Sequence, residues 1–575
     1  MPAEINLMVG GEAGQGVQTI GFILAKTLSR AGLFVFADQD YESRIRGGHN
    51  FYRVRASDSE VQALTEEMDI LIAIDQNTIE FHHSEIREQG VIIFDQDKVR
   101  AEGKKANLLG IPLERLSQEK TSNKLMANSV AIGAAIAVGG YEFALLEQTL
   151  KEHFAHLGKD IIDGNVKAAR AGYDHARQQS PGLVRPRIKA LNQATDMMLL
   201  NGNESLALGA MAAGCKFMAG YPMTPTTSII EYMADKGRKF NIVVIQPEDE
   251  IAAINMAVGA GFAGVRAMTA TSGDGFALMT EGYGLAGMTE TPVVIVLGQR
   301  SGPAVGLPTR TEQGELGFAI YGGSGEFPRA VLAPCTIEDA FHTAVRAFNL
   351  AEKYQIPVVI LTDEYLATSY QTVKKFDLSQ VKIDRGQLIS DEEASRLNGY
   401  KRHQFTESGI SPRLMPMRGK ALVVTDSDEH DETGHTIDDA VMRNRMMLKR
   451  LKKSDGLNSE FAKPRLYLKP DAEMTLVGWG SSFGAINEAA QMVEKEGLRV
   501  NVMQFNEIWP FPAQAVTSAL SSTKRSVVIE NNATGQLRRL IRAETGILAS
   551  GGILKFDGRP FSPKQIATQL SKEAA

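Results

Sequence analysis

The chain has 575 residues, which is too long for one hydrophobic core and is typical of about three to four domains. Its 43% hydrophobic and 23% charged residues are ordinary for a globular protein, and its net charge of -6 offers no general attraction for nucleic acid. One basic cluster, Leu448–Lys453, is predicted to be a solvated helix face rather than a nucleic-acid site.

The chain contains two cysteines, Cys215 and Cys335, which can form at most one disulfide and indicate a reducing cytoplasm. An iron–sulfur cluster normally takes about four cysteine ligands, so we expect this chain to carry none of its own. The N-terminal sequence lacks a basic segment followed by an apolar one, and the small apolar run Val130–Gly140 falls short of the ~20 residues that span a bilayer. We therefore expect a cytoplasmic protein without a membrane span, in which this run is a buried helix.

Alternating strands and helices predict an α/β domain with a parallel sheet in residues 1–190. An apolar strand leads through the loop Gly11-x-x-Gly14-x-Gly16 to a helix that ends at Gly32. Such a loop presents backbone N–H groups and the positive end of a helix dipole to a phosphate. The spacing is not the Gly-x-Gly-x-x-Gly of dinucleotide sites, so three interpretations stay open: a dinucleotide, another phosphate-bearing ligand, or a tight turn alone.

A basic turn, Arg44–Arg55, follows in the same domain, with four arginines and a histidine around two glycines. It is predicted to be solvated, to bind the same anion as the glycine loop, or to dock a partner. The segment Arg177–Gln193 is rich in proline and charge and has no periodicity, so it is predicted to be a linker.

Two further α/β domains are predicted for residues 195–375 and 469–575, with an irregular connecting segment, 376–468, between them. In the first of these domains, Asn203 is predicted to be a helix N-cap and Gly214 to end that helix.

The connecting segment and the last domain contain weaker candidate sites. His430, Asp431, Glu432 and His435 lie close in sequence, but the wide histidine spacing and the lack of a third ligand favour an ordered surface connection over a metal site. In the last domain, Gly497 is predicted to end a helix. Glu530–Asn532 and the following Gly535-Gln536 are its best candidates for a ligand contact, with an N-cap role for Asn532 as the alternative.

The stretch Phe217–Gln313 carries the parts of a site for a small anion. Pro222 and Pro225 fix φ on both sides of Thr224, so its hydroxyl lies in a stiff turn. That turn is either a rigid connection or a preorganised hydrogen-bond donor.

Three acids, Glu248, Asp249 and Glu250, precede a helix of small residues. A carboxylate at a helix N-terminus interacts favourably with the dipole, but three acids are more than one cap needs. Gly273 and Gly275 begin another helix and form a candidate anion or cofactor loop.

Arg300 follows a strongly apolar strand. Ligands of open α/β sheets bind beyond the carboxyl ends of the strands, where a guanidinium can hold a carboxylate through two parallel hydrogen bonds. The alternative is a solvated arginine at a strand end. Together these residues indicate an enzyme that acts on small carboxylates.

The combined motifs resemble those of the 2-oxoacid:ferredoxin oxidoreductases, specifically an alpha subunit with the gamma domain fused at its N-terminus. The resemblance covers the whole chain. It rests on GGEAGQG and RGGHN in the gamma-like part, on YPMTP, EDEIAAI, TSGDGFALMTEG and RSGPAVGLPTRTEQ in the alpha-like part, and on SDEHDETG and ENNATGQLRRLIR beyond it. Met223 stands where the family more often has Ile, which is a conservative change. Each motif alone is weak, but their combination is specific.

The resemblance implies three α/β domains: a gamma-type domain, a pyrimidine-binding-type thiamine diphosphate domain and a transketolase C-terminal-like domain. It implies that Glu250 contacts the aminopyrimidine of thiamine diphosphate and that Thr224 and Arg300 contact the substrate carboxylate. Thr309 matches a further active-site threonine. The loop of Gly11, Gly14 and Gly16 is then best placed to meet the phosphates of coenzyme A.

The resemblance also implies partners. In this family a separate beta subunit carries the [4Fe-4S] cluster and the Mg²⁺- and diphosphate-binding half of the thiamine site, in agreement with the low cysteine count. We therefore expect an alpha-beta heterodimer or a dimer of heterodimers that is active only when assembled. Ferredoxin accepts the electrons and coenzyme A accepts the acyl group.

Among substrates the sequence favours 2-oxoglutarate, because the fused arrangement and the segments GLPTRTEQ and SDEHDETG look most like that branch. Pyruvate and branched-chain 2-oxoacids stay as alternatives, and the direction of flux and the residue for a distal carboxylate stay open. Two other classes also remain: a dehydrogenase that binds NAD through the Gly11 loop, and a non-catalytic docking subunit.

Overall fold

The computed structural model describes residues 3–42, 48–101, 106–179, 181–183, 188–191 and 196–574. Arg44 and Arg46 of the predicted basic turn, and parts of the predicted linker, lie outside these residues. The chain divides into two compact units: unit 1 comprises Met1–Leu200, Thr368–Phe376 and Ser562–Gln565, and unit 2 comprises the rest. The helices and strands confirm the α/β multidomain fold class. The domain boundaries expected from the sequence stay predictions.

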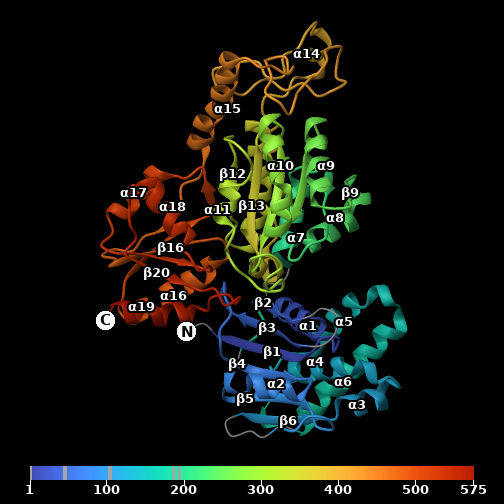
Figure 1. Ribbon diagram of the computed structural model, residues 1–575. Helices are drawn as coiled ribbons and strands as arrows, with labels where there is room; N and C mark the ends of the chain where they lie inside the picture. Colours follow the sequence, from blue (N-terminus) through green and yellow to red (C-terminus); the bar gives the residue numbers. More distant parts are fainter. Residues whose placement is uncertain are drawn as a thin grey trace. The chain divides into compact units, whose positions relative to one another are not determined.

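Unit 1 contains an eight-stranded sheet in the order β6-β5-β4-β1-β3-β2-β14-β7 (Figure 1). Its strands are β1 (Glu4–Glu12), β2 (Phe34–Asp40), β3 (His49–Ser57), β4 (Met68–Ala73), β5 (Ile86–Asp95), β6 (Asn107–Ile111), β7 (Met197–Asn201) and β14 (Tyr370–Lys374). Alternate residues of β1 face opposite sides of the sheet: Leu7 and Val9 belong to one buried cluster and Met8 to another.

The α-helices that accompany this sheet are α1 (Val17–Arg30), α2 (Gln76–His82), α3 (Leu113–Thr121), α4 (Ala127–Val138), α5 (Phe143–His153) and α6 (Lys159–Gln179). Small residues let α4 and α6 approach closely, since a Cβ on Gly133 would lie 1.9 Å from the carbonyl oxygen of Ala169. Helix α4 is the predicted buried helix, and Gly32 follows α1 with a φ of +82° as expected. No helix in the described ranges is both long and apolar enough to cross a membrane.

The sheet of unit 1 is mixed, so the predicted parallel sheet is confirmed for only some of its strands. Strands β1, β4, β5 and β6 are parallel neighbours, but β3 runs antiparallel to both β1 and β2. A parallel pair needs a crossover of roughly a dozen residues or more, and the connection from β2 to β3 is too short for one. Part of the predicted basic turn is therefore strand β3, in which Arg53 pairs with Glu85 (2.7 Å) and Arg55 with Glu4 (3.0 Å).

Unit 2 contains a seven-stranded sheet in the order β18-β12-β13-β11-β10-β8-β9. Its strands are β8 (Phe217–Ala219), β9 (Val243–Ile245), β10 (Ala267–Thr271), β11 (Val293–Gln299), β12 (Ala330–Leu332), β13 (Pro357–Asp363) and the antiparallel edge strand β18 (Glu507–Trp509). The remaining neighbours are parallel.

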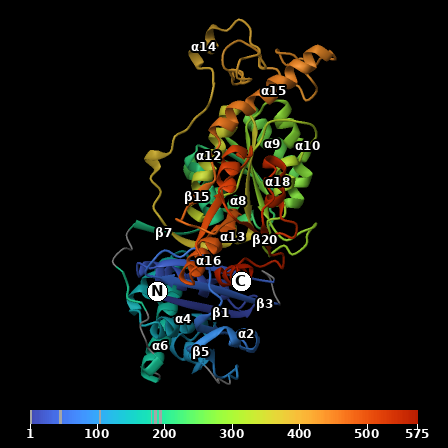
Figure 2. The same cartoon turned by 90° about the vertical axis from the view of Figure 1, so that its left-hand side faces the viewer.

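Helices cover both faces of this sheet. The helices are α7 (Gly202–Ala212), α8 (Thr227–Phe240), α9 (Glu250–Phe262), α10 (Gly273–Met288), α11 (Leu316–Tyr321), α12 (Ile337–Tyr354) and α13 (Glu364–Thr368). Ile295 of β11 packs with α9, α10 and α11, whereas its neighbours Val294 and Val296 pack with α7, α8 and α12. Both faces of β11 are therefore buried, which explains its unbroken apolar sequence. Helices α9 and α10 lie side by side in both views (Figures 1 and 2).

The C-terminal part of unit 2 forms a five-stranded sheet in the order β15-β17-β16-β19-β20. The strands are β15 (Arg465–Tyr467), β16 (Met474–Trp479), β17 (Val500–Phe505), β19 (Ser526–Glu530) and β20 (Gly551–Leu554), and its helices are α16 (Phe483–Lys495), α17 (Ala513–Ser521) and α18 (Gln536–Thr545). The last helix, α19 (Pro563–Ala574), begins with residues of unit 1 and continues in unit 2. Gly497 follows α16 with a positive φ, as predicted.

The connecting segment contains α14 (Asp391–Arg396) and α15 (Ala440–Glu460), which carries the basic cluster. The predicted solvated face is wrong. Lys449 and Lys453 are buried and both pair with Glu290, which also accepts a hydrogen bond from His403 at 2.9 Å, and Arg450 pairs with Glu429 at 2.7 Å. These basic side chains can be buried because each pairs with a carboxylate that lies outside α15. The charge composition of the segment alone does not indicate these partners.

Candidate active site

The ends of three parallel strands meet at one edge of the seven-stranded sheet. β8 ends at Ala219, β10 at Thr271 and β11 at Gln299. Because neighbouring parallel strands end at the same edge, the turn around Thr224, the start of α10 and Arg300 all lie there. Helix α9 follows β9, the strand beside β8, so Glu250 also begins its helix at this edge.

The turn after β8 is held by side chains of α7 and α8. Asn203 donates hydrogen bonds to the carbonyl oxygen of Pro225 (2.7 Å) and to the hydroxyl of Ser228 (2.8 Å). The predicted N-cap role of Asn203 is wrong: Asn201 caps α7 in a capping box with Glu204. The sequence does distinguish these two asparagines: Glu204 stands three residues after Asn201, the spacing of a capping box, whereas Leu206 stands three residues after Asn203. Gly214 does follow the helix with positive φ.

The three adjacent acids have three different environments. Asp249 is the N-cap of α9 and accepts a hydrogen bond from the backbone N–H of Ala252 at 2.8 Å, while Glu248 is exposed. Glu250 is 3% exposed, and its Oε1 atom is buried without a hydrogen-bond partner among the described residues. Buried polar atoms are nearly always paired, so this oxygen marks a place for a ligand donor. A Cβ on Gly275 would lie 2.9 Å from the same oxygen.

Arg300 lies 8% exposed directly after β11. Its Nη1 donates to the carbonyl oxygen of Thr224 at 3.1 Å, so the structure brings these two predicted residues together. Its Nη2 donates to Asp274 at 2.8 Å, and its Nε has no partner in the described part of the chain. The arginine is therefore not solvated, and Asp274 is a site residue that the sequence did not single out.

Glu315 is a second residue that sequence reasoning missed. Burial, and then the nearby charges of Glu312 and Asp274, raise the pKa of Glu315 to about 8. Its Oε1 lies 2.7 Å from the position of a Cβ on Gly273, and its Oε2 has no hydrogen-bond partner within the described ranges. Burial likewise raises the pKa of Glu312. Only the fold brings these carboxyl groups to the start of α10.

Thr309 lies half-buried in the loop that follows Arg300. The loop closes on itself through a bridge between Ser301 and Leu307. No hydrogen bond joins Thr309 to Thr224, Glu250 or Arg300 in the part of the chain that the structure describes, so its predicted role stays a prediction.

The glycine loop of unit 1 is a separate candidate site. Gly11 lies at the end of β1, Gly14 and Gly16 have positive φ, and Gly16 precedes α1 without a side-chain cap. The amide of Asn128 donates to the carbonyl oxygen of Gln15 at 2.9 Å and supports the loop from α4. The first turn of α1 has no acidic residue, so its N–H groups suit an anion.

A chain of ionisable side chains lies beside this loop. His49 Nε2 lies 2.8 Å from His82 Nε2, and His82 Nδ1 lies 2.9 Å from Glu85. His49 approaches Gly10, where a Cβ would lie 3.2 Å from its Cε1 atom. Burial, and then His82, lower the pKa of His49. A neutral imidazole beside the loop can either donate or accept a hydrogen bond.

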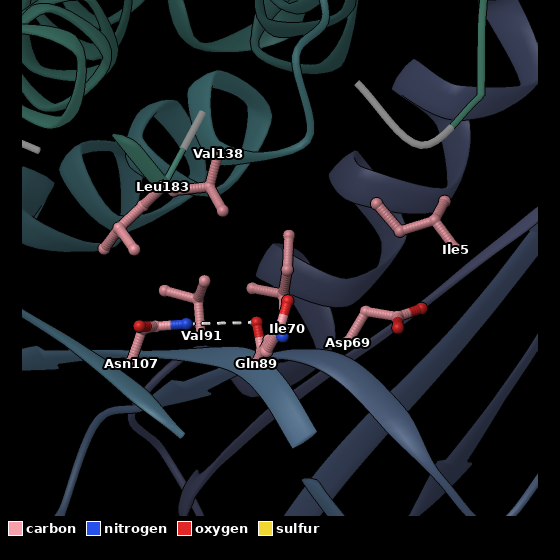
Figure 3. A pocket seen from close by; sticks show the side chains of 8 residues that line it. All are labelled: Ile5, Asp69, Ile70, Gln89, Val91, Asn107, Val138 and Leu183. Carbon is pink, nitrogen blue, oxygen red and sulfur yellow. Dashed lines mark hydrogen bonds between the residues drawn. The ribbon is translucent and has the colours of Figure 1, made fainter. Parts of the chain in front are cut away.

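A small cavity of about 20 Å³ lies elsewhere in unit 1 (Figure 3). Its lining includes Ile5, at the opposite end of β1 from the glycine loop, and Asn107, whose amide donates to the carbonyl oxygen of Gln89 at 3.1 Å. This volume suits about one water molecule and excludes a cofactor.

The weaker candidates serve the fold. Glu530 accepts hydrogen bonds from the backbone N–H groups of Leu537 and Arg538 at the start of α18, and Asn532 accepts one from Gly535. His430 is buried and contacts the ring of His403 in a tilted arrangement, with 4.0 Å between ring centroids. Among the described residues, no group of three or more His, Cys, Asp or Glu side chains could hold a metal ion.

Family models match three stretches of the chain. One described as pyruvate flavodoxin/ferredoxin oxidoreductase, thiamine diphosphate-binding, matches residues 208–449. Models of pyruvate ferredoxin/flavodoxin oxidoreductase and of pyruvate:ferredoxin oxidoreductase core domain II match residues 6–175 and 472–566.

Relatives match over most of the chain. The 2-oxoacid:ferredoxin oxidoreductase subunit alpha of Sulfolobus sp is 31% identical over 99% of this chain and 97% of its own length. The 2-oxoglutarate synthase subunit KorA of Methanothermobacter thermautotrophicus is 33% identical over 66% of this chain and 99% of its own. A solved 2-oxoglutarate:ferredoxin oxidoreductase from Magnetococcus marinus, with 2-oxoglutarate, coenzyme A and succinyl-CoA bound, has a TM-score of 0.92 at 30% identity, with 100% of both chains covered.

Proposed function

Because this chain belongs to the 2-oxoacid:ferredoxin oxidoreductase alpha subunits, we propose that it converts 2-oxoglutarate and coenzyme A to succinyl-CoA and CO2 with electrons passed to ferredoxin, or catalyses the reverse carboxylation. The observation that carries the proposal is the buried oxygen of Glu250, which has no hydrogen-bond partner among the described residues and lies at the same sheet edge as Arg300. In this pair, Glu250 offers a carboxylate to a cofactor, and Arg300 offers a guanidinium to the carboxylate of a substrate.

Glu250 would bind thiamine diphosphate through its aminopyrimidine. When bound, this cofactor supplies the carbon nucleophile that adds to a 2-oxo group and accepts the electrons left by decarboxylation. The carboxylate of Glu250 would hold a proton on a ring nitrogen, and Gly275 leaves room beside its Oε1 atom. The orphaned Oε1 fits this role, because a ring N–H would satisfy it.

Arg300 and Thr224 would bind the carboxylate of the 2-oxoacid, with Thr309 as a further contact. The Nε of Arg300 is buried and unpartnered within the described residues, so the side chain has a donor for an incoming anion. A guanidinium held by the backbone of Thr224 keeps its orientation before substrate arrives, which lowers the cost of binding.

The other half of the site would come from a beta subunit that holds the [4Fe-4S] cluster and Mg²⁺. Both cysteines of this chain are buried and free. Exposed apolar side chains lie on the elements that form the half-site: Ile251 (47% exposed) is the second residue of α9, Leu278 (51%) lies on α10, and Val305 (63%) and Leu307 (52%) lie in the loop after Arg300. Exposed apolar groups of this kind are typical of protein interfaces, in support of an alpha-beta heterodimer or a dimer of heterodimers.

The glycine loop of unit 1 would meet the phosphates of coenzyme A. Support comes from the uncapped start of α1, from the positive φ of Gly14 and Gly16, and from the coenzyme A bound in the Magnetococcus marinus enzyme. His49 would add a hydrogen bond to the same phosphates.

A panel of 2-oxoacids tests the substrate. The chain is co-expressed with its beta subunit, and viologen reduction is measured with coenzyme A and each of 2-oxoglutarate, pyruvate and a branched-chain 2-oxoacid. We expect the highest kcat/KM with 2-oxoglutarate. A higher kcat/KM with pyruvate would change the assigned substrate but keep the reaction class. Reduction of NAD without ferredoxin would contradict the proposal.

A further inference from the structure

Asp274 and Arg300 form an ion pair in which the arginine side chain is held more tightly than the aspartate side chain. Asp274 is the second residue of α10, and its carboxylate accepts from Arg300 Nη2 at 2.8 Å. The arginine side chain is 9% exposed and is also fixed to the carbonyl oxygen of Thr224, whereas the aspartate side chain is 36% exposed. The guanidinium is therefore the fixed partner, and the carboxylate is the one that can turn away.

The donors of Arg300 limit how another carboxylate can bind. A bidentate carboxylate needs two parallel N–H groups of the guanidinium fork. The fork that includes the unpartnered Nε also includes Nη2, which Asp274 already engages. An incoming carboxylate therefore meets Asp274 on the same nitrogen, and the two negative charges repel each other.

We propose that Asp274 determines affinity and specificity by competing, inside the protein, with the carboxylate of the 2-oxoacid for the guanidinium of Arg300. In the substrate-free enzyme Asp274 neutralises the arginine. The 2-oxoacid displaces it, and the released carboxylate turns to solvent, where it is already partly exposed. This inference rests on the proposed function, because it takes Arg300 as the substrate-binding residue.

Such competition leaves small anions weakly bound, and the difference from a 2-oxoacid lies in the additional contacts that only the 2-oxoacid makes. Acetate or chloride that displaces Asp274 contacts only the guanidinium of Arg300, whereas a 2-oxoacid also makes contacts through its oxo group. Repulsion by a nearby like charge lowers the affinity of every anion for Arg300 equally, so only ligands with the additional contacts bind well. Glu315 lies close enough to Asp274 and Arg300 to interact with both electrostatically, so its charge lowers the affinity for anions further when it is ionised.

The test is Asp274→Asn in the assembled alpha-beta complex, which keeps the shape of the side chain and removes its charge. We expect KM for 2-oxoglutarate to fall about tenfold, the effect of removing a partly buried competing charge, with little change in kcat. Titration calorimetry with N-oxalylglycine, an unreactive isostere of 2-oxoglutarate, should show about tenfold tighter binding, and acetate should become a competitive inhibitor. Tenfold corresponds to about 1.4 kcal/mol.

The control is Glu281→Gln, which removes an exposed carboxylate from the same helix and should change none of these values. Unchanged or weaker binding of N-oxalylglycine by Asp274→Asn would overturn the inference, since it would mean that Asp274 orients Arg300 instead of competing with substrate. If Asp274→Asn fails to assemble, Asp274→Ser provides the same measurement. Failure of the wild-type complex to turn over any 2-oxoacid would contradict the proposed function itself, so the two failures are distinct.

Discussion

Glu250 and Glu315 are buried carboxyl groups at the same sheet edge, but their surroundings differ. Glu250 begins α9, where the N-terminal end of the helix favours a negative charge. Glu315 is surrounded by other acids, and its pKa is raised to about 8 by burial and by the charges of Glu312 and Asp274. The fold therefore provides one side chain whose buried oxygen can accept from a ligand donor and one carboxyl group that keeps its proton near neutral pH.

The raised pKa of Glu315 predicts a pH-dependent stability. Between about pH 4.5 and 8 the unfolded chain releases this proton while the folded chain keeps it, so the group's contribution to stability falls as pH rises. Glu315→Gln mimics the protonated form and removes this dependence. We expect the melting temperature of the variant, relative to that of the wild type, to increase as pH rises across this window. A constant difference in melting temperature would contradict the assignment.

The candidate site was only partly predictable at this scale. Local signals singled out Thr224, Arg300 and the run of three acids, because proline, helix-start acids and a post-strand arginine can be seen in the sequence, and the family resemblance then selected Glu250 among the acids. Asp274 and Glu315 were missed, because their contacts cross between elements that are distant in sequence, and Asn203 was assigned the wrong role.

At the scale of elements, buried charges attach the connecting segment to the rest of unit 2. Burial alone would raise the pKa of Glu290, but Lys449 and Lys453 hold it well below its usual range. Each of the three side chains is 1% exposed. The ion pairs therefore hold α15 against the C-terminal end of α10 only while all the partners are present.

Glu290→Gln tests this attachment. The substitution leaves two buried lysines without their carboxylate, and breaking such a pair typically costs about 3–5 kcal/mol. We expect the urea midpoint of the transition that includes α15 to fall accordingly. Glu281→Gln, at an exposed position of α10, serves as the control. Equal midpoints for the two variants would show that the cluster contributes nothing to stability.

Helix ends were easier to predict than strand pairing. Gly32, Gly214 and Gly497 each follow a helix with positive φ, as glycine's conformational freedom suggests. Strand β3 was missed, because its arginines suggested a solvated turn while its alternating buried residues, Tyr52 and Val54, were the stronger signal. The direction of a strand depends on its connection and neighbours, which the pattern of one segment does not contain.

At the scale of the whole molecule, the exposed apolar side chains near the half-site predict where the beta subunit docks. Leu278→Glu places a charge in that surface and should weaken association with the beta subunit at least about tenfold, without lowering the melting temperature of the chain alone. Leu448→Glu, on the exposed side of α15, is the matched control. Sedimentation of the mixed subunits measures both. Equal affinities would place the interface elsewhere.

The central claim is that Glu250 binds and polarises thiamine diphosphate in an enzyme that forms succinyl-CoA. The most direct measurement compares succinyl-CoA formation by the assembled complex with wild-type chain and with Glu250→Gln, and uses the exposed Glu248→Gln as control. Loss of this carboxylate should lower kcat by roughly 10²–10⁴-fold, and the control should keep full activity. Full turnover by Glu250→Gln would contradict the claim.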